Sequence, residues 1–273
     1  MGDACTYPMT WEEAVRWLCE HPDQNKRDLA RACYFDGSPT DAAKRFHVSK
    51  EWEIVRSLLP ETVGTALDLG AGRGISSYAL AKDGWTVTAL EPNDSSFIGA
   101  GAIKTIASET SLPITVALAM AEDLPFPESS FDLIHCRQAL HHAGDLHKMV
   151  SEAMRVLRAG GTFLATREHV LTRKSDLRVF QDTHPLHHLY GGEYAYTLDE
   201  YRAAFAAQSP SRIEEFSPYQ SELNFFPDNL DAERHRLARI AGVKPDQIPD
   251  FVFKIRDHYD SNPGRLYSFR VTK

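Results

Sequence analysis

A glycine-rich loop between a predicted strand and a predicted helix constrains the fold of this chain more than any other feature. The loop reads Asp68-Leu69-Gly70-Ala71-Gly72-Arg73-Gly74, and it separates the apolar residues 65–67 from the helix-forming residues 75–81. Alternate glycines let a backbone approach a ligand closely, because they carry no Cβ atom. A dinucleotide-binding loop has a further glycine where this chain has Ile75, so the sequence disfavours NAD or FAD. The carboxylate of Asp68 suits a cationic or amine-bearing ligand better than a phosphate.

Predicted strands follow the loop at the spacing of an open α/β sheet. Residues 84–91 form a turn and a β-rich run that ends in Glu91, about twenty residues after the loop. In α/β folds a carboxylate at this place accepts hydrogen bonds from both hydroxyls of a ribose. Further strands are predicted at 114–118, at 131–136 and, after a helix end and a glycine turn, within 156–164. The pattern therefore indicates an α/β domain that binds a ribose-containing ligand.

Four motifs in this order resemble the class I S-adenosylmethionine (SAM)-dependent methyltransferases, in particular the ubiquinone-biosynthesis-like, methyltransferase type 11 group. They are DLGAGRG, the strand end at Glu91, AEDLPFPESSFDLIHCRQALHH and RVLRAGGTF, and the resemblance covers roughly residues 63–166. It implies a Rossmann-like, seven-stranded and mostly parallel sheet with helices on both faces and an antiparallel last strand. It also implies SAM as the cofactor and S-adenosylhomocysteine as the product.

The resemblance assigns parts of the cofactor to positions in this sequence. Asp68 and the glycine-loop backbone would hold the methionine part, Glu91 the ribose hydroxyls, and Pro92 would lie beside the adenine. The family often has an aspartate where this chain has Met120, so adenine recognition is expected to use backbone groups or Glu122. Cys136 and Arg137 are expected near the methionyl tail. The predicted cofactor-binding residues are Asp68, Gly70, Ala71, Gly72, Gly74, Glu91, Pro92, Ala121, Glu122, Cys136 and Arg137.

The composition favours a cytoplasmic enzyme with a small-molecule acceptor. The chain has 273 residues, of which 42% are hydrophobic and 25% charged, as in ordinary globular proteins. No apolar run approaches the eighteen or so residues of a membrane span, and the formal net charge of -8 disfavours a nucleic-acid substrate. Self-association into a homo-oligomer is left open. The four cysteines, which lack metal-ligand spacing and are expected as reduced thiols, are Cys5, Cys19, Cys33 and Cys136.

Three regions are predicted along the chain. Residues 1–60 contain apolar side chains at helical spacing and are interpreted as a helical cap or lid. Residues 61–273 form the SAM-binding core, with a helical insertion at 221–263 before the last strand. Within the core, a capping box at 197–200 begins a helix, and the last two strands are predicted at 211–216 and 266–271. Specificity for the acceptor is expected in the cap and the insertion.

The predicted catalytic residues follow the fourth and fifth strands. SN2 methyl transfer from a sulfonium needs mainly alignment, and it needs a general base only where the acceptor must lose a proton. His142 is the preferred base, because histidine titrates near neutrality, and His141 and Glu168 are further candidates. The alternative is that the two histidines cap or pack the next helix.

A second cluster, at residues 184–194, contains three histidines and two tyrosines around a glycine pair. It is interpreted as part of the acceptor site, with metal binding and a structural loop as alternatives, and no metal site is assigned. Tyr34, Phe35 and Trp52 of the cap are expected in the core. The predicted acceptor-binding residues are His169, His187, His188, Tyr190 and Tyr194.

The predicted function is SAM-dependent methylation of a small molecule, at oxygen or nitrogen rather than carbon. One alternative is a methyltransferase that acts on RNA or protein. Another is a non-catalytic SAM-binding protein with a regulatory or scaffold role, because the glycine loop and Glu91 would support binding equally well there. An NAD-dependent oxidoreductase is disfavoured by Ile75.

Overall fold

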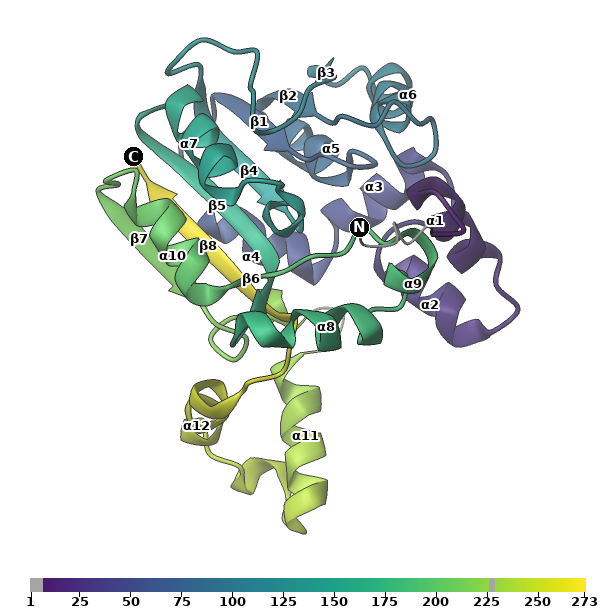
Figure 1. Cartoon of the computed structure of the whole chain (residues 1–273), viewed down its shortest axis with the longest axis vertical. Coiled ribbons are helices and arrows are strands. Elements are labelled where there is room, and N and C mark those ends of the chain that lie inside the picture. The colour runs from purple at the N-terminus through teal and green to yellow at the C-terminus, as the bar shows by residue number, and fades with distance from the viewer. Residues whose placement is uncertain (1–6, 226–228) are drawn as a thin grey trace, which may run out of the picture.

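Strands that are buried on both faces form the centre of one mixed β-sheet in this computed structural model, which describes residues 7–225 and 229–273 (Figure 1). The strand order is β3-β2-β1-β4-β5-β8-β7, and β6 pairs with β5 outside this path. The strands are β1 (Thr65–Leu69), β2 (Thr86–Leu90), β3 (Ile114–Ala117), β4 (Phe131–Arg137), β5 (Leu157–Leu171), β6 (Tyr196–Thr197), β7 (Arg212–Phe216) and β8 (Arg265–Thr272).

The directions of the strands confirm the predicted Rossmann-like sheet. Strands β1 to β5 pair in parallel, and the last strand, β8, runs antiparallel to both β5 and β7. The two-residue strand β6 was not predicted, because Thr197 is also the N-cap of a helix and reads as a helix start. From β1 the chain adds β2 and β3 on one side and β4 and β5 on the other, so the strand order reverses at β1. Open α/β sheets bind their ligands at the carboxyl ends of the strands next to such a reversal.

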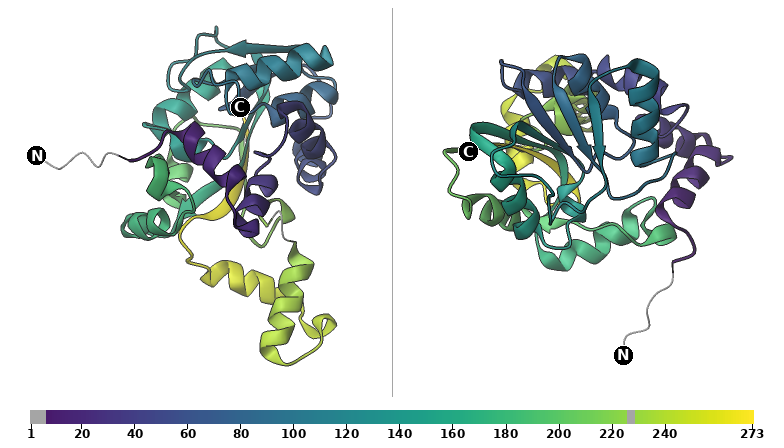
Figure 2. Two further views of the ribbon diagram at one scale, coloured as in Figure 1. Left: turned by 90° about the vertical axis from the view of Figure 1, so that its right-hand side faces the viewer. Right: turned by 90° about the horizontal axis from the view of Figure 1, so that it is seen from above.

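Helices cover both faces of the sheet (Figure 2). On one face α7 (Leu146–Val156) and α10 (Leu198–Ala206) pack on side chains such as Leu67 and Ile134. The other face carries α3 (Pro39–His47), α4 (Lys50–Leu58), α5 (Ile75–Lys82) and α6 (Ala100–Thr110) on alternate side chains such as Ala66 and Leu133. Successive residues of a strand point to opposite faces, so one strand supports two separate cores.

The N-terminal helices divide into two pairs with different surroundings. Helices α1 (Trp11–Glu20) and α2 (Gln24–Ala32) pack against α9 (His187–Tyr190), which follows α8 (Leu177–Thr183), as Figure 1 shows. Helices α3 and α4 instead join the core beneath the sheet, where Phe46 and Trp52 are fully buried.

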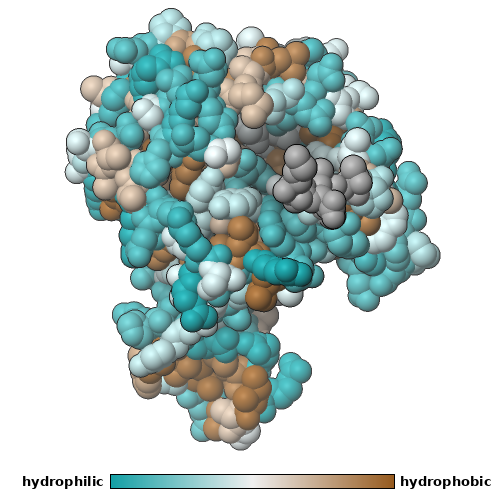
Figure 3. Space-filling view, viewed as in Figure 1, coloured by the Kyte–Doolittle hydropathy of each residue, from teal (hydrophilic) through white to brown (hydrophobic). Residues whose placement is uncertain are grey.

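A helical hairpin extends from the body of the molecule between β7 and β8 (Figure 1). It consists of α11 (Leu230–Ala241) and α12 (Phe251–Tyr259), and both helices lie within residues 221–263, where the sequence predicts a helical insertion. Its surface includes exposed apolar side chains, among them Ile240, Phe251 and Tyr259 (Figure 3). In the described ranges, no helix has the length and apolar character to cross a membrane. The division into cap, core and insertion stays a prediction.

Asp83, just after α5, fixes α3 and α4 to the core. Its carboxylate accepts hydrogen bonds from Trp52 Nε1 at 2.8 Å and Arg56 Nε at 2.7 Å, and it pairs with His47 Nε2 at 2.8 Å. Burial alone would raise the pKa of Asp83, but the hydrogen bonds from Arg56, His47 and Trp52 outweigh burial and lower that pKa.

Replacement of Asp83 by alanine should lower the free energy of unfolding by about 1–3 kcal/mol, because three donors, one of them on the fully buried Trp52, lose their acceptor. The pKa of Asp83 is lower in the folded state, so its contribution is complete above the unfolded value of about 3.9 and is lost as the pH falls through the folded value. The difference in free energy of unfolding between the wild type and Asp83→Ala should therefore become smaller as the pH is lowered from 7 to 3. Denaturant unfolding over this pH range measures it. Glu53→Ala, on the exposed face of α4, is the matched control and should change stability by less than about 0.5 kcal/mol. A pH-independent difference would contradict the assignment.

Candidate active site

A cavity of about 660 Å³ lies at the carboxyl ends of the central strands, beside the reversal in strand order. The glycine loop and Glu91 line one end of it. Further parts of the lining come from His141 and His142 of the short helix η1 (Leu140–His142), from the segment 184–193, and from Trp11 and residues 33–35 of the N-terminal region. One cavity therefore joins the predicted cofactor-binding residues to the predicted catalytic histidines.

The three glycines of the loop have different roles. All three have positive φ angles, +71° at Gly70, +52° at Gly72 and +83° at Gly74, which disfavour other residues. A Cβ atom at Gly70 would lie 2.6 Å from Ala139 Cβ, and one at Gly74 would lie 2.9 Å from a side-chain carbon of Ile103. A Cβ atom at Gly72 would meet no protein atom within 4 Å, and Gly72 lines the cavity. Gly70 and Gly74 thus permit close packing, and Gly72 leaves room for a ligand.

Glu91 holds the glycine loop in place from the end of β2. Its carboxylate accepts hydrogen bonds from Gly72 N at 2.8 Å and from Asn93 N at 3.0 Å. Burial raises the pKa of Glu91, and these two N–H donors oppose the shift. Each carboxylate oxygen keeps a second lone pair, and Glu91 borders the cavity. The side chain can therefore orient the loop and accept ligand hydroxyls at the same time.

Asp68 and Arg73 connect the loop to its surroundings. Asp68 is buried, accepts a hydrogen bond from Ser77 Oγ at 2.5 Å and borders the cavity. Arg73 donates to the carbonyl oxygens of Tyr34 at 2.8 Å and Gly37 at 2.9 Å, which ties the segment after α2 to the glycine loop. Tyr34 and Phe35 consequently line the cavity, although the sequence placed them only in the core.

The structure separates the remaining predicted cofactor residues into two groups. Pro92, Ala121, Glu122 and Arg137 line the cavity with Ala71, whereas Gly74 and Cys136 do not. Cys136 is fully buried in the core below η1. Cys136 therefore does not reach the cavity, because neighbouring residues of β4 face opposite sides of the sheet and Arg137 takes the cavity side.

A buried charge cluster that the sequence analysis missed supports Arg137. Its guanidinium donates to Glu51 at 2.6 and 3.1 Å, and Arg167 Nε lies 3.7 Å from the same carboxylate. Burial would raise the pKa of Glu51, but the two guanidiniums outweigh burial and lower that pKa. Two guanidiniums lie against one buried carboxylate here, and both arginines also line the cavity. Glu51 lies on α4, far from any motif, and no local sequence signal connects it to the site.

Glu168 positions His141 rather than facing the cavity. Its fully buried carboxylate accepts hydrogen bonds from Ala139 N and His141 N, both at 3.1 Å, and from His141 Nδ1 at 2.7 Å. A carboxylate accepts, so Nδ1 carries the proton and Nε2 of His141 keeps its lone pair. Burial, followed by the charges of His142 and His184, lowers the pKa of His141 well below its usual range. His141 is therefore a neutral imidazole on the cavity wall.

His142 is the more exposed member of the pair and also borders the cavity. Its Nδ1 lies 3.2 Å from the carbonyl oxygen of Gly192, so Nδ1 donates and Nε2 again keeps a lone pair. The ring centroids of His141 and His142 are 4.1 Å apart. The predicted catalytic pair is thus held on η1 by two acceptors behind the rings, one from β5 and one from the segment after α9.

The predicted acceptor-binding residues are only partly brought together. His169 and Tyr190 line the cavity, but His187, His188 and Tyr194 do not. His187 pairs with Tyr7 Oη at 3.3 Å, and His188 is exposed. The structure therefore does not bring these three side chains to the cavity. The helical turn of α9 directs His187 and His188 away from it, and Tyr194, which lies after α9, has its ring against Tyr196.

Two residues that the sequence analysis did not select complete this end of the cavity. Glu193, which is buried, accepts a hydrogen bond from Tyr190 Oη, and its carboxylate lies 3.6 Å from His184 Nε2. Burial lowers the pKa of His184 to about 4 and that of His169 to about 3. The sequence does contain a signal that could have identified Glu193 as a site residue, because it is an acidic residue directly after a glycine pair in a histidine-rich segment.

Comparisons with known proteins agree with this geometry. Residues 67–165 match the family model described as a methyltransferase domain. An uncharacterized methyltransferase of Bacillus subtilis, YcgJ, is 38% identical over 106 residues, which cover 36% of this chain and 38% of the relative. The human mitochondrial arginine-hydroxylase NDUFAF5 is 29% identical over 163 residues, which cover 60% of this chain and 38% of the relative. Thus the matched segment spans 38% of the length of each of these two relatives.

The fold is also that of solved methyltransferases. The structure of Haemonchus contortus phosphoethanolamine N-methyltransferase 2 in complex with SAM superposes with a TM-score of 0.59 at 19% identity, covering 95% of this chain and 59% of that one. Sheet order, glycine loop and matched domain together define an α/β methyltransferase domain. The chain contains a domain of the class I SAM-dependent methyltransferases, which confirms the resemblance seen in the four sequence motifs.

Replacement of Gly72 by valine should weaken SAM binding by at least ~100-fold, because the branched side chain would fill the space next to the loop. Gly160→Val is the matched control, since Gly160 also has a positive φ and open surroundings but is an exposed residue of β5 outside the cavity lining. Isothermal titration calorimetry of both variants measures the effect. Equal SAM affinity in the two variants would contradict the role of Gly72.

Proposed function

We propose that this chain transfers the methyl group of SAM to a small-molecule acceptor that binds in the second half of the same cavity. The observation that carries this proposal is the continuity of the cavity from Gly72 and Glu91 to the His141–His142 pair. A donor and an acceptor bound in one cavity react as if they belonged to one molecule, which supplies much of the acceleration.

In this proposal the cofactor occupies the end of the cavity at the glycine loop. Glu91 accepts the ribose hydroxyls, and the adenine lies between Pro92 and the residues 121–122. Asp68 faces the amino group of the methionine part. The guanidinium of Arg137, which Glu51 holds at the cavity wall, suits the carboxylate of the methionine part. The sulfonium then points towards η1.

The transfer step makes modest demands on the protein. A lone pair of the acceptor attacks the methyl carbon, the bond from carbon to sulfur breaks, and neutral S-adenosylhomocysteine leaves. Where the acceptor is a hydroxyl or an ammonium group, His142 Nε2 takes its proton, and the Gly192 carbonyl stabilises the imidazolium through Nδ1. Glu168 acts through His141 as a positioning residue, because it does not reach the cavity.

The wall around the acceptor end favours a small and largely apolar acceptor. Trp11, Leu18, Phe35 and Leu186 line this part of the chain's cavity, and the nearby histidines His169 and His184 have lowered pKa values. Uncharged imidazoles can donate or accept single hydrogen bonds, which suits a hydroxyl or amine on an apolar body. The net charge of -8 counts against RNA as the acceptor.

A second candidate function is SAM binding without methyl transfer. One relative is named an arginine-hydroxylase, so similarity to this domain includes a protein whose named reaction is not methylation. The donor end of the cavity serves both functions equally, and only the fate of the methyl group separates them.

Titration of the purified protein with SAM, S-adenosylhomocysteine and NAD, followed by an acceptor screen that detects S-adenosylhomocysteine release, tests the proposal. We expect micromolar binding of both adenosyl ligands, no binding of NAD, and turnover with a small apolar hydroxyl or amine compound. Binding without turnover across oxygen and nitrogen acceptors would favour the second candidate. Folded protein that binds neither adenosyl ligand would contradict both.

Replacement of Glu91 by alanine should weaken SAM binding by about 1–3 kcal/mol, because the ribose hydroxyls lose their acceptor and Gly72 N loses its partner. Glu91→Gln keeps a hydrogen-bond acceptor and should lose less. Glu128→Ala, at an exposed surface position, is the control in the same calorimetric series. Wild-type affinity in Glu91→Ala would remove Glu91 from the cofactor site.

His142→Ala should lower turnover by about 100-fold or more while leaving SAM affinity unchanged, because a general base contributes mainly to the chemical step. His147→Ala, which removes an exposed imidazole on α7, is the matched control. Both variants are to be assayed with an acceptor identified in the screen. Unchanged turnover in His142→Ala would return His142 to a structural role on η1.

A further inference from the structure

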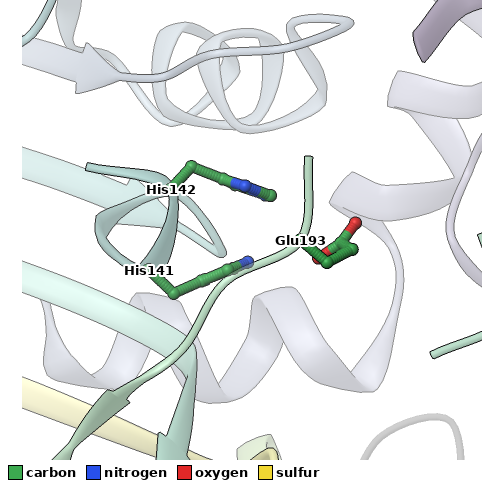
Figure 4. Close-up of side chains that lie close together, drawn as sticks. All are labelled: His141, His142 and Glu193. Atoms are coloured by element: carbon green, nitrogen blue, oxygen red, sulfur yellow. The ribbon is translucent and has the colours of Figure 1, made fainter. Parts of the chain in front are cut away.

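We propose that His141, His142 and Glu193 form a binding site for a divalent transition-metal ion at the acceptor end of the cavity (Figure 4). One potential ligand atom from each residue lies within 4.8 Å of the other two. The two histidines come from η1 after β4, and the carboxylate comes from the segment after α9. All three residues line the same cavity. The site joins two parts of the chain that are fifty residues apart in sequence, as the contact from His142 to Gly192 also shows.

The set of ligand atoms selects the kind of ion. Two imidazole nitrogens and one carboxylate suit Zn²⁺, Fe²⁺ or Co²⁺, whereas Mg²⁺ and Ca²⁺ prefer oxygen ligands. Three protein ligands also leave at least one coordination position open, as in metal sites that bind a further ligand. In this chain the open position would face the cavity, so an oxygen or nitrogen atom of a bound small molecule could occupy it.

The groups behind the three residues are those that orient metal ligands in other proteins. A histidine ligand commonly donates its second N–H to a carboxylate or a backbone carbonyl. His141 Nδ1 is 2.7 Å from Glu168, and His142 Nδ1 is 3.2 Å from the Gly192 carbonyl oxygen. Both Nε2 lone pairs therefore stay available for an ion. Glu193 is held in the same way, because the Tyr190 hydroxyl donates to its carboxylate.

Distances and charge are compatible with an ion. In a tetrahedral Zn²⁺ site with bonds of about 2.0–2.2 Å, the ligand atoms are about 3.4 Å apart. The exposed side chain of His142 can close the remaining gap by rotating about its χ angles. Glu193 is buried, and a buried carboxylate is costly unless a positive charge or hydrogen bonds compensate it. A cation between Glu193 and the two imidazoles would supply that charge.

An ion at this site would change the chemistry of His142. It would use the Nε2 lone pair that accepts a proton in the proposed methyl transfer, so ion binding and general-base catalysis by His142 exclude each other. This consequence rests on the proposed function, but ion binding itself does not.

Titration of tag-free, chelator-treated protein with Zn²⁺, Co²⁺ and Mg²⁺ tests the site, by calorimetry for all three ions and by visible absorption for Co²⁺. We expect one Zn²⁺ per chain, Co²⁺ bands of a low-symmetry site, and no Mg²⁺ binding. His142→Ala and Glu193→Gln should each weaken Zn²⁺ binding by at least ~10-fold. His147→Ala and His188→Ala, which remove exposed histidines outside the cavity, should keep wild-type affinity.

Absence of stoichiometric Zn²⁺ binding to folded wild-type protein would overturn the inference, as would Zn²⁺ binding that survives both ligand substitutions. Because His142 is exposed, its alanine variant tests the site even where Glu193→Gln lowers stability. SAM titrations on the same samples keep the two proposals apart. SAM binding without Zn²⁺ binding overturns only the ion site, and Zn²⁺ binding without SAM binding overturns only the proposed methyl transfer.

Discussion

The hydrogen bonds that Glu168 accepts from residues 139–141 determine the geometry of the acceptor end of the site. This carboxylate is fully buried, and it fixes both the backbone of η1 and the imidazole of His141. Buried polar groups of this kind are stable only when all their partners are present. The position of His142, one residue further along, depends on the same turn. Thus a side chain that does not reach the cavity controls which atoms of His141 and His142 do.

The fold and the cofactor end of the site could be predicted because their signals are local. Gly70, Gly72 and Gly74 stand between a strand and a helix, and Glu91 follows at the spacing of one βαβ unit, so a short stretch of sequence contains the whole pattern. Even there, the sequence could not separate Gly72, which faces the cavity, from Gly74, which packs on α6. Cys136 does not reach the cavity for a related reason, because the motif fixes a segment of β4 and only the alternation of the strand decides which side chain reaches the cavity.

The acceptor end could not be predicted in detail because it is assembled from distant segments. Glu51 on α4 meets Arg137 on β4 across 86 residues, and Glu193 approaches His142 through the turn at Gly192. These contacts depend on how α4 and α9 pack on the rest of the domain, and the pattern of a single sequence does not specify which residues meet in such packing. Functional differences on a shared α/β core commonly arise in such added segments. The N-terminal helices and the segment 184–193 lie outside the matched methyltransferase domain at residues 67–165, and both contribute to the cavity lining.

The most direct test of this account is a crystal structure of the protein with S-adenosylhomocysteine. The account predicts that both ribose hydroxyls lie within hydrogen-bond distance of Glu91, that the homocysteine chain passes Gly72, and that the sulfur atom faces His141 and His142 across the remaining cavity. An adenosyl group bound away from Glu91, or a sulfur atom that faces away from the two histidines, would contradict the claim that one cavity brings donor and acceptor together.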